Sequence, residues 1–191
     1  YAAQPGLRVH VGDALEFDYA ALAHARGRQL RVIGNLPYNI STPLLFRLLA
    51  HSEQFLDMHF MLQKEVVDRI VALPGSRQYG RLGVMLAPRV RAMRLLEIGP
   101  GAFRPAPRVR SALVRLEVLP QLPGWAAGPH YAAVVAAAFG QRRKTLRNSL
   151  GGLLDAGQIA AAGIDPGARA ETLAPAQFGQ LAMAVAAATP L

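Results

Sequence analysis

The 191-residue sequence contains no cysteine, and only 2 of its 21 basic residues are lysine. Without cysteine the chain forms no disulfides and offers no thiolate ligands to a metal ion. Its 5 histidines show no spacing typical of a metal site, so we expect no bound metal. No apolar run reaches the roughly 18 residues that a membrane-spanning helix needs, and no secretory signal pattern is present. These absences favour a cytoplasmic protein without a membrane partner.

Acidic residues are also scarce, so the net charge is +9, and the basic residues are clustered. The stretch from Arg77 to Arg115 holds nine arginines and one acid, and the stretch from Phe139 to Leu150 holds four basic residues and no acid. Such clusters are typical of proteins that bind a polyanion. Arginine pairs with phosphate and stacks on bases, which favours RNA. A GC-rich genome would explain the choice of arginine over lysine, but not the clustering.

The hydrophobic pattern divides the chain into two parts. Through residues 1–119, strands alternate with helices, which is typical of an α/β fold with a mostly parallel sheet. We expect strands at 7–11, 30–33, 58–62, 91–98 and 111–118, the last two as an antiparallel pair, and helices at 17–26, 42–50, 63–73 and 81–87. Residues 120–129 have the proline and glycine content of a linker.

Residues 130–191 are predicted to form a small all-helical domain. We expect its helices at 131–139, 142–154, 156–161 and 175–188. Asp165 followed by Pro166 is typical of a helix N-cap with proline at the first helical position.

The residues most informative about function follow the apolar strand predicted at 30–33: Asn35, Leu36, Pro37 and Tyr38. The carboxyl ends of parallel strands border the ligand crevice of an open α/β sheet. The side-chain amide oxygen of Asn35 and the backbone carbonyl of Leu36 can accept both N–H bonds of an exocyclic amine. Holding the amine of adenine in this way would orient a poor nucleophile for methylation.

The next two residues of this motif suit the same task. Pro37 has no N–H and a fixed φ, so it stiffens the turn that presents the two acceptors. Tyr38 offers a ring face on which a base can stack, an interaction worth about 1–3 kcal/mol. Methyl transfer to an amine held in this way depends on positioning and needs no strong base. The alternative interpretation is an ordinary proline turn followed by a tyrosine of the core.

Three blocks of the sequence together resemble one family: residues 34–43 (GNLPYNISTP), 60–66 (FMLQKEV) and 141–150 (QRRKTLRNSL). They resemble the bacterial small-subunit ribosomal RNA adenine dimethyltransferases, and the resemblance extends along essentially the whole chain. The first block is shared with related RNA adenine methyltransferases, so the third block is the more discriminating. The resemblance implies a Rossmann-like sheet that binds S-adenosylmethionine, followed by a small helical domain that binds RNA.

The same resemblance assigns roles to individual residues. It implies that Asp13, Ala14 and Asn35 contact the cofactor S-adenosylmethionine. It also implies that Phe103 lies on the far side of the target base from Tyr38, so that the two rings hold an extruded base. An aspartate after a strand is otherwise a common cap, and an aromatic residue in a loop commonly fills the core. The sequence departs from the family at Arg110, where many members have aspartate.

Residues 97–102 (EIGPGA) imitate the glycine-rich cofactor loop of methyltransferases. A loop of that kind needs a helix N-terminus after it, whereas Pro105 and Pro107 follow here and prevent an ordinary helix. We therefore predict a rigid loop between the last two strands. Because no cofactor loop is visible ahead of Asp13, we expect that an N-terminal section is missing from this chain, at least one strand–helix–strand unit of roughly 30 residues.

The block at 141–150 predicts one face for the core and another for RNA. Apolar residues recur at roughly helical spacing and are expected to face the core: Phe139, Leu146, Leu150 and Leu153. The polar residues are predicted to bind RNA: Arg142, Arg143, Lys144, Arg147 and Asn148. Arg143 and Arg147 would stand one turn apart, where contacts to phosphate position an RNA without reading its sequence. A run of charge is otherwise often only a solvated helix face.

The family resemblance implies an enzyme that dimethylates N6 of two adjacent adenines in a hairpin near the 3′ end of small-subunit ribosomal RNA, during small-subunit biogenesis. We expect a monomer whose partner is the small ribosomal subunit. Two alternatives remain open. A non-catalytic ribosome-assembly factor on the same fold is favoured for this chain by the absence of a cofactor loop. A DNA adenine-N6 methyltransferase more often has proline or a similar residue at the second motif position.

Overall fold

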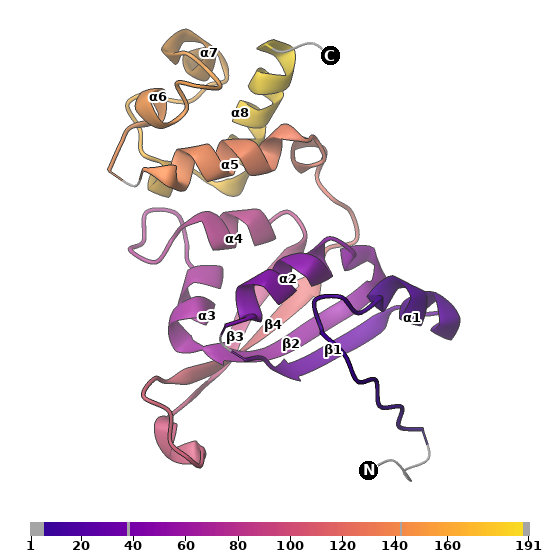
Figure 1. The fold of residues 1–191 in the computed structure, drawn as a ribbon. Coiled ribbons are helices and arrows are strands. Elements are labelled where there is room, and N and C mark those ends of the chain that lie inside the picture. The colour runs from indigo at the N-terminus through magenta and orange to yellow at the C-terminus, as the bar shows by residue number, and fades with distance from the viewer. Residues whose placement is uncertain (1–5, 38, 142, 189–191) are drawn as a thin grey trace.

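The computed structural model describes residues 6–37, 39–141 and 143–188. A sheet with its helices forms one half of the molecule, and a bundle of helices forms the other (Figure 1). The sheet contains β1 (Leu30–Asn35), β2 (Phe55–Gln63), β3 (Val90–Ile98) and β4 (Ser111–Val118), in the order β1-β2-β4-β3. β1 and β2 are parallel, whereas β4 is antiparallel to both of its neighbours, which confirms the predicted terminal pair. The expectation of a mostly parallel sheet was wrong for the described residues, because the terminal pair joins β2 through β4 and makes two of the three strand pairings antiparallel.

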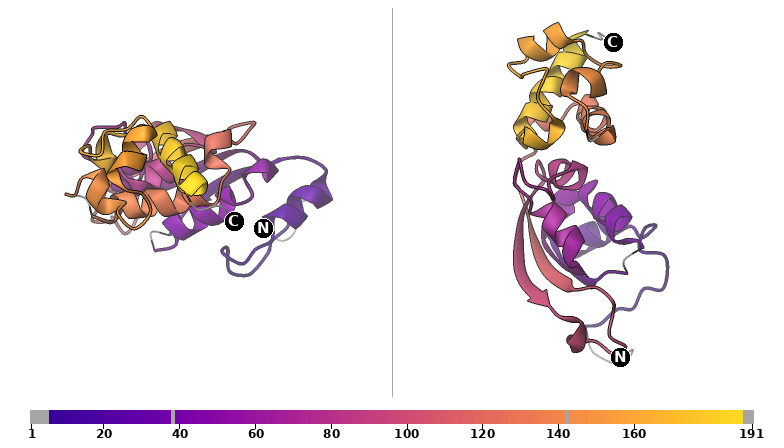
Figure 2. Two further views of the ribbon diagram at one scale, coloured as in Figure 1. Left: turned by 90° about the horizontal axis from the view of Figure 1, so that it is seen from above. Right: turned by 90° about the vertical axis from the view of Figure 1, so that its left-hand side faces the viewer.

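Helices cover one face of this sheet, as the right-hand view of Figure 2 shows. They are α1 (Tyr19–Arg26), α2 (Ser41–Leu49), α3 (Lys64–Ile70) and α4 (Arg81–Leu86). Four leucines of α2 are buried and pack with the apolar side chains of β2 and β4 in one core: Leu44, Leu45, Leu48 and Leu49. A Cβ on Gly83 of α4 would lie 2.9 Å from the carbonyl oxygen of Arg69, so glycine is what lets α4 approach the end of α3.

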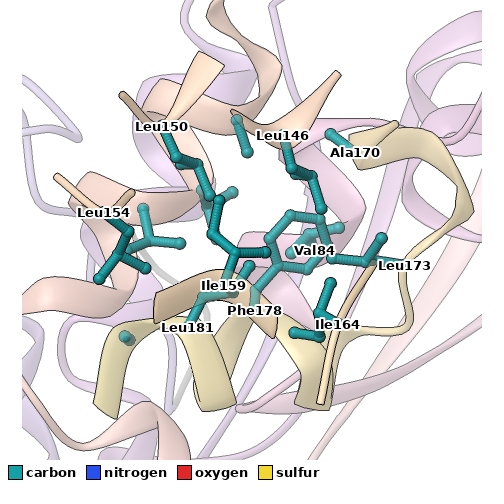
Figure 3. Close-up of a cluster of buried hydrophobic side chains, with 14 of the residues drawn as sticks. Val84, Leu146, Leu150, Leu154, Ile159, Ile164, Ala170, Leu173, Phe178 and Leu181 are labelled. Atoms are coloured by element: carbon teal, nitrogen blue, oxygen red, sulfur yellow. The ribbon is translucent and has the colours of Figure 1, made fainter. Parts of the chain in front are cut away.

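The helical half contains α5 (His130–Gly140), α6 (Leu146–Ser149), α7 (Ala156–Ala161) and α8 (Pro175–Ala188). Its core is built from leucine, isoleucine, valine and phenylalanine, and Leu146, Leu150 and Phe178 are fully buried there. Val84 of α4 lies in the same cluster (Figure 3). The partly buried Phe139 and Leu153 also pack against it, so the predicted apolar face of the 139–153 segment is confirmed.

The two halves are also joined by hydrogen bonds to backbone carbonyl groups. The hydroxyl of Tyr79 donates to the carbonyl oxygen of Leu173 at 2.7 Å, and the hydroxyl of Tyr131 donates to that of Val84 at 2.9 Å. The N–H of Gly75 donates to the carbonyl oxygen of Glu171 at 2.7 Å. Residues 75–84 are therefore held by the helical half, although they precede the last two strands of the sheet.

Three predicted elements differ in the structure. Residues 7–11 form no strand, and Val11 is 98% exposed, because the described chain supplies no neighbouring strand to pair with them. The helix predicted at 142–154 is reduced to α6, because Thr145 has extended backbone angles (φ −73°, ψ 161°). Asp165 and Pro166 begin a turn instead of a helix, in which the Asp165 carboxylate accepts from the N–H of Gly167 at 2.8 Å.

Candidate active site

The motif at residues 35–37 lies where β1 ends. The N–H of Leu36 donates to the carbonyl oxygen of Met61 at 3.2 Å, which continues the pairing of β1 with β2 by one residue. The N–H of Ile40 then donates to the carbonyl oxygen of Pro37 at 3.2 Å and turns the chain into α2. The side chain of Leu36 is buried in the core of the sheet half, whereas Asn35 and Pro37 are exposed. The turn is thus anchored through Leu36 and presents the amide of Asn35 outward.

Phe103 lines the same cavity as this motif. A cavity of about 280 Å³ is lined by three residues of the motif and three of the β3–β4 connection: Asn35, Leu36, Pro37, Phe103, Pro105 and Pro107. One side-chain amide is therefore set among apolar walls that include an aromatic ring. A small flat molecule with an exocyclic amine suits such a space, because its ring contacts apolar groups while its N–H bonds meet oxygen acceptors.

The β3–β4 connection is a loop, as the sequence predicts. Its only regular piece is a single 3₁₀ turn at Pro100–Ala102, in which the N–H of Phe103 donates to the carbonyl oxygen of Pro100 at 3.1 Å. Residues 97–98 end strand β3, and no helix lies between Ala102 and the start of β4, so the segment 97–102 lacks the helix N-terminus that a cofactor loop needs after it.

Asp13 and Ala14 lie in a turn ahead of α1. The carboxylate of Asp13 is exposed and accepts from the N–H of Leu15 at 2.8 Å. The carbonyl oxygen of Ala14 accepts from the hydroxyl of Tyr19 at 3.0 Å. Neither residue lines the cavity at Asn35. Asp13 and Ala14 therefore lie outside the cavity that Asn35 lines, and their contact with a cofactor stays a prediction.

A larger groove of about 990 Å³ runs from the carboxyl end of β2 to the helical half. Thr42 and Gln63 line it near the Asn35 motif, and Phe139 and Ala170 line it at the helical half. Five cationic side chains border it: Lys64, Arg69, Arg77, Arg81 and Arg110. Sequence reasoning did not identify this groove, although the cluster of arginines between Arg77 and Arg115 was its signal.

Acidic side chains lie beside the cations of this groove. Lys64 donates to Asp68 at 2.6 Å, and this hydrogen bond raises the pKa of the lysine. Arg69 forms a short ion pair with Glu65 one turn away, and Arg110 lies 3.9 Å from Glu97. The groove is therefore a mixed-charge surface with an excess of cations, rather than a continuous basic strip.

The predicted RNA-binding residues do not share one helical face. Arg143 and Lys144 are exposed and precede α6, whereas Arg147 and Asn148 are exposed on it. The expectation that Arg143 and Arg147 stand one turn apart on a helix was wrong, because the helix begins only at Leu146. Tyr38 and Arg142 lie outside the described residues.

Two absences hold for the part of the chain that the structure describes. None of its helices combines the length and apolarity needed to cross a bilayer. Nor do three histidine, aspartate or glutamate side chains gather anywhere in 6–37, 39–141 or 143–188 as a metal site requires.

Comparison with known proteins adds the family. A family model described as ribosomal RNA adenine dimethylase matches residues 3–187. A curated relative from Acidithiobacillus ferrooxidans, ribosomal RNA small subunit methyltransferase A, is 54% identical over 182 residues, covering 93% of this chain and 67% of the relative. A relative of the same name from Pseudomonas putida is 51% identical over 187 residues, covering 95% of this chain and 68% of the relative. The chain thus spans about two thirds of the length of these relatives.

Solved structures show the same fold at lower sequence identity. A dimethyladenosine transferase from Plasmodium falciparum matches with a TM-score of 0.74 and 22% identity, covering 95% of this chain and 73% of that one. The 23S rRNA methyltransferase ErmE matches with a TM-score of 0.63 and 20% identity, covering 83% and 66%. The sheet half therefore has the Rossmann-like methyltransferase fold, with a helical part after it. By its sequence along nearly its whole length, the chain belongs to the ribosomal RNA adenine dimethylase family.

Proposed function

We propose that this protein transfers methyl groups from S-adenosylmethionine to N6 of adenine in small-subunit ribosomal RNA. The finer proposal is that two adjacent adenines in a hairpin near the 3′ end of that RNA are each dimethylated during small-subunit biogenesis. One observation of the structure carries the proposal: the cavity that joins Asn35, at the end of β1, to Phe103 in the β3–β4 loop. The names of the curated relatives support the substrate.

The residues of the cavity would act by positioning. The amide oxygen of Asn35 and the carbonyl oxygen of Leu36 accept the two N–H bonds of the adenine amine and direct its lone pair away from the ring. Phe103 contacts the face of a base that has left its stack, and Tyr38, which lies outside the described residues, is proposed to hold the other face. Pro37 keeps the two acceptors in place because its φ is fixed.

S-adenosylmethionine would supply the methyl group as an electrophilic carbon when bound. Of the residues proposed to contact it, Asn35 lines the cavity, whereas Asp13 and Ala14 lie in a separate turn. The described residues thus provide only part of the fit, and the proposal for the cofactor rests on the family. We propose that the carboxylate of Asp13 accepts a hydrogen bond from the adenine amine of the cofactor.

The helical half is proposed to hold the RNA. We propose that residues 1–119 belong to the methyltransferase domain, that 120–129 form a linker and that 130–191 form an RNA-binding domain. Arg143, Lys144, Arg147 and Asn148 are exposed there and offer contacts to phosphate. Cationic side chains line the groove between the two halves, from the edge of the sheet near Asn35 to the helical half. We propose that an RNA strand next to the target adenine binds along this groove.

The test incubates the protein with labelled S-adenosylmethionine and either undermethylated small ribosomal subunits or DNA. Label in N6,N6-dimethyladenine of the RNA is the expected result. Tight binding of the subunit without transfer would instead identify a non-catalytic assembly factor, and label in DNA alone would identify a DNA adenine methyltransferase. The family match along residues 3–187 disfavours both alternatives.

A further inference from the structure

The loop that carries Phe103 projects from the sheet and has little support of its own. Figure 1 shows the β3–β4 connection extending away from the helices. In the described part of the chain, the backbone hydrogen bonds within residues 99–109 are local, from Ala102 to Gly99 and from Phe103 to Pro100. The position of the loop must therefore be set at its base.

Four charged side chains close a ring at that base, which we call the charge ring: Lys64, Asp68, Arg94 and Glu97. Asp68 lies 2.6 Å from Lys64 and 2.9 Å from Arg94. Glu97 lies 3.1 Å from Arg94 and 3.6 Å from Lys64. Each acid thus bridges both cations, and each cation bridges both acids.

The charge ring joins the loop to the motif side of the sheet. Arg94 and Glu97 belong to β3, which leads into the loop, whereas Lys64 and Asp68 belong to α3, which follows β2 directly. β2 pairs with β1 so that Met61 lies beside Asn35. At the other end of the loop, the N–H of Lys64 donates to the carbonyl oxygen of Arg110 at 2.9 Å.

Glu97 is the central acid of this arrangement. It faces three cations, because the guanidinium of Arg110 also lies 3.9 Å from its second oxygen. The side chain of Glu97 is 33% exposed and that of Asp68 is 21% exposed, so water screens the charge ring only in part. Without the charge of Glu97, Asp68 would be the one acid left in the ring, and the repulsion among Lys64, Arg94 and Arg110 would drive the base of the loop apart.

We propose that Glu97 is a positioning residue: through the charge ring it fixes loop 99–110 so that Phe103 stands opposite Asn35. The role of Phe103 in holding a base rests on the proposed function. The positioning of the loop does not, because it is a property of the protein without RNA. Glu97 is not among the residues that line the cavity, so its effect must pass through the loop.

The test compares Glu97→Gln with Glu117→Gln. Glu117 is the matched control because it is also a glutamate of this strand pair with a cationic partner, Arg91 at 4.0 Å, but it lies at the end of β3 and β4 that is remote from the loop. Hydrogen exchange of the protein without RNA is measured at the amides of residues 101–104. We expect severalfold faster exchange in Glu97→Gln and no change in Glu117→Gln. Equal exchange in the two variants would overturn the proposal.

A second measurement separates positioning from a general loss of stability. An RNA hairpin with 2-aminopurine in place of a target adenine is titrated with the wild type, Glu97→Gln, Phe103→Ala and the double variant. Quenching by the protein reports stacking of the probe. We expect Glu97→Gln to quench the probe less than the wild type does. We expect the double variant to quench it as much as Phe103→Ala alone, because the effect of Glu97 passes through Phe103.

The outcomes of the two measurements are distinct. An equal effect of Glu97→Gln in both backgrounds would show that it does not act through Phe103, and would overturn the positioning role. If the wild type fails to bind the hairpin at all, the proposed function fails, and the exchange comparison still decides whether the charge ring holds the loop.

Discussion

Leu36 and Asn35 are neighbours in the chain with opposite surroundings. The side chain of Leu36 is 8% exposed and packs in the core of the sheet half, while Asn35 is exposed at the cavity. The alternation along β1 produces this difference, since successive side chains of a strand point to opposite faces. One residue can therefore fix the turn while the other is offered to a ligand.

The ring of Phe103 should contribute to the affinity for RNA by stacking on the target base. Phe103→Ala should weaken stacking of a target base by about 1–3 kcal/mol, which is roughly a 5- to 150-fold loss of affinity for RNA. Phe103→Trp keeps an aromatic face and should retain most of the affinity. A binding titration with an RNA hairpin gives the dissociation constants. Equal affinity of the alanine variant and the wild type would remove Phe103 from the base-binding site.

Gly179 of α8 provides a second prediction, about stability. A Cβ at this buried position would lie 2.6 Å from a ring carbon of Trp125. Gly179→Ala should therefore destabilise the protein by about 1–3 kcal/mol through overpacking. Gly140→Ala is the control, because a Cβ there meets nothing within 4 Å. Denaturant unfolding measures both variants, and an unchanged midpoint for Gly179→Ala would mean that the indole moves away without cost.

At the scale of elements, the sequence predicts α7 and α8 with the limits that the structure shows. The start of α7 is fixed by a capping box. The carboxylate of Asp155 accepts from the backbone N–H of Gln158, and the side-chain oxygen of Gln158 accepts from the backbone N–H of Asp155. The strand expected at 7–11 fails because a strand needs a partner, and apolar alternation does not show whether one is present. The hydrophobic pattern of a segment predicts a helix or strand best where residues of that segment cap its ends, as they do in α7.

The segment before α6 shows the same limit. The N–H groups of Leu146 and Arg147 donate to the carbonyl oxygens of Ala168 and Pro166, at 2.9 and 3.0 Å. These contacts with a distant turn start the helix at Leu146 and leave Arg143 and Lys144 outside it. Helical spacing within residues 142–154 could not reveal a partner that lies well beyond that window in the chain.

Arg147 on α6 gives a prediction about RNA. If its exposed guanidinium contacts one phosphate, Arg147→Ala should weaken RNA binding for all sequences and reduce the slope of log affinity against log salt by about one. Arg28→Ala is the matched control, because Arg28 is exposed at the turn before β1 in the sheet half. Titrations at several salt concentrations measure the slope. Identical slopes for the two variants would place α6 outside the RNA interface.

For the whole molecule, the junction of the two halves depends on buried tyrosines. Burial raises the pKa of Tyr79 to about 12 and raises the pKa of Tyr131 as well. Both hydroxyls donate across the junction, to Leu173 and Val84. Because the same helical core includes Val84, the halves should unfold together rather than as separate units.

The raised pKa of Tyr79 predicts how stability changes with pH. An unfolded tyrosine ionises near pH 10, so the contribution of folded Tyr79 is fully present below pH 10 and is lost as the pH rises toward 12. Tyr79→Phe should cost about 0.5–1.5 kcal/mol at pH 7, through the lost hydrogen bond. Its deficit relative to the wild type should narrow between pH 10 and 12. Unfolding free energies across this range measure it, and a constant deficit would contradict the shifted pKa.

The candidate site could be predicted from the sequence only in pieces. Chemistry pointed to Asn35 because a side-chain amide oxygen at a strand end can accept an N–H bond of an exocyclic amine, and the family resemblance pointed to Phe103. Their meeting at one cavity depends on the order β1-β2-β4-β3, which brings the late hairpin back to the early strands. The groove between the halves escaped prediction because its cations come from α3, the α3–α4 connection, α4 and the β3–β4 loop, and only the tertiary fold gathers them.

The role of Asn35 is tested most directly by comparing Asn35→Ala with Asn39→Ala, because Asn39 is an exposed asparagine four residues away. Methyl transfer from labelled S-adenosylmethionine and affinity for undermethylated small subunits are measured for both. We expect Asn35→Ala to bind RNA nearly as the wild type does and to lose transfer by about 100-fold or more, because the amine is no longer oriented. Asn39→Ala should retain both. Undiminished transfer by Asn35→Ala would show that this amide does not hold the reacting adenine.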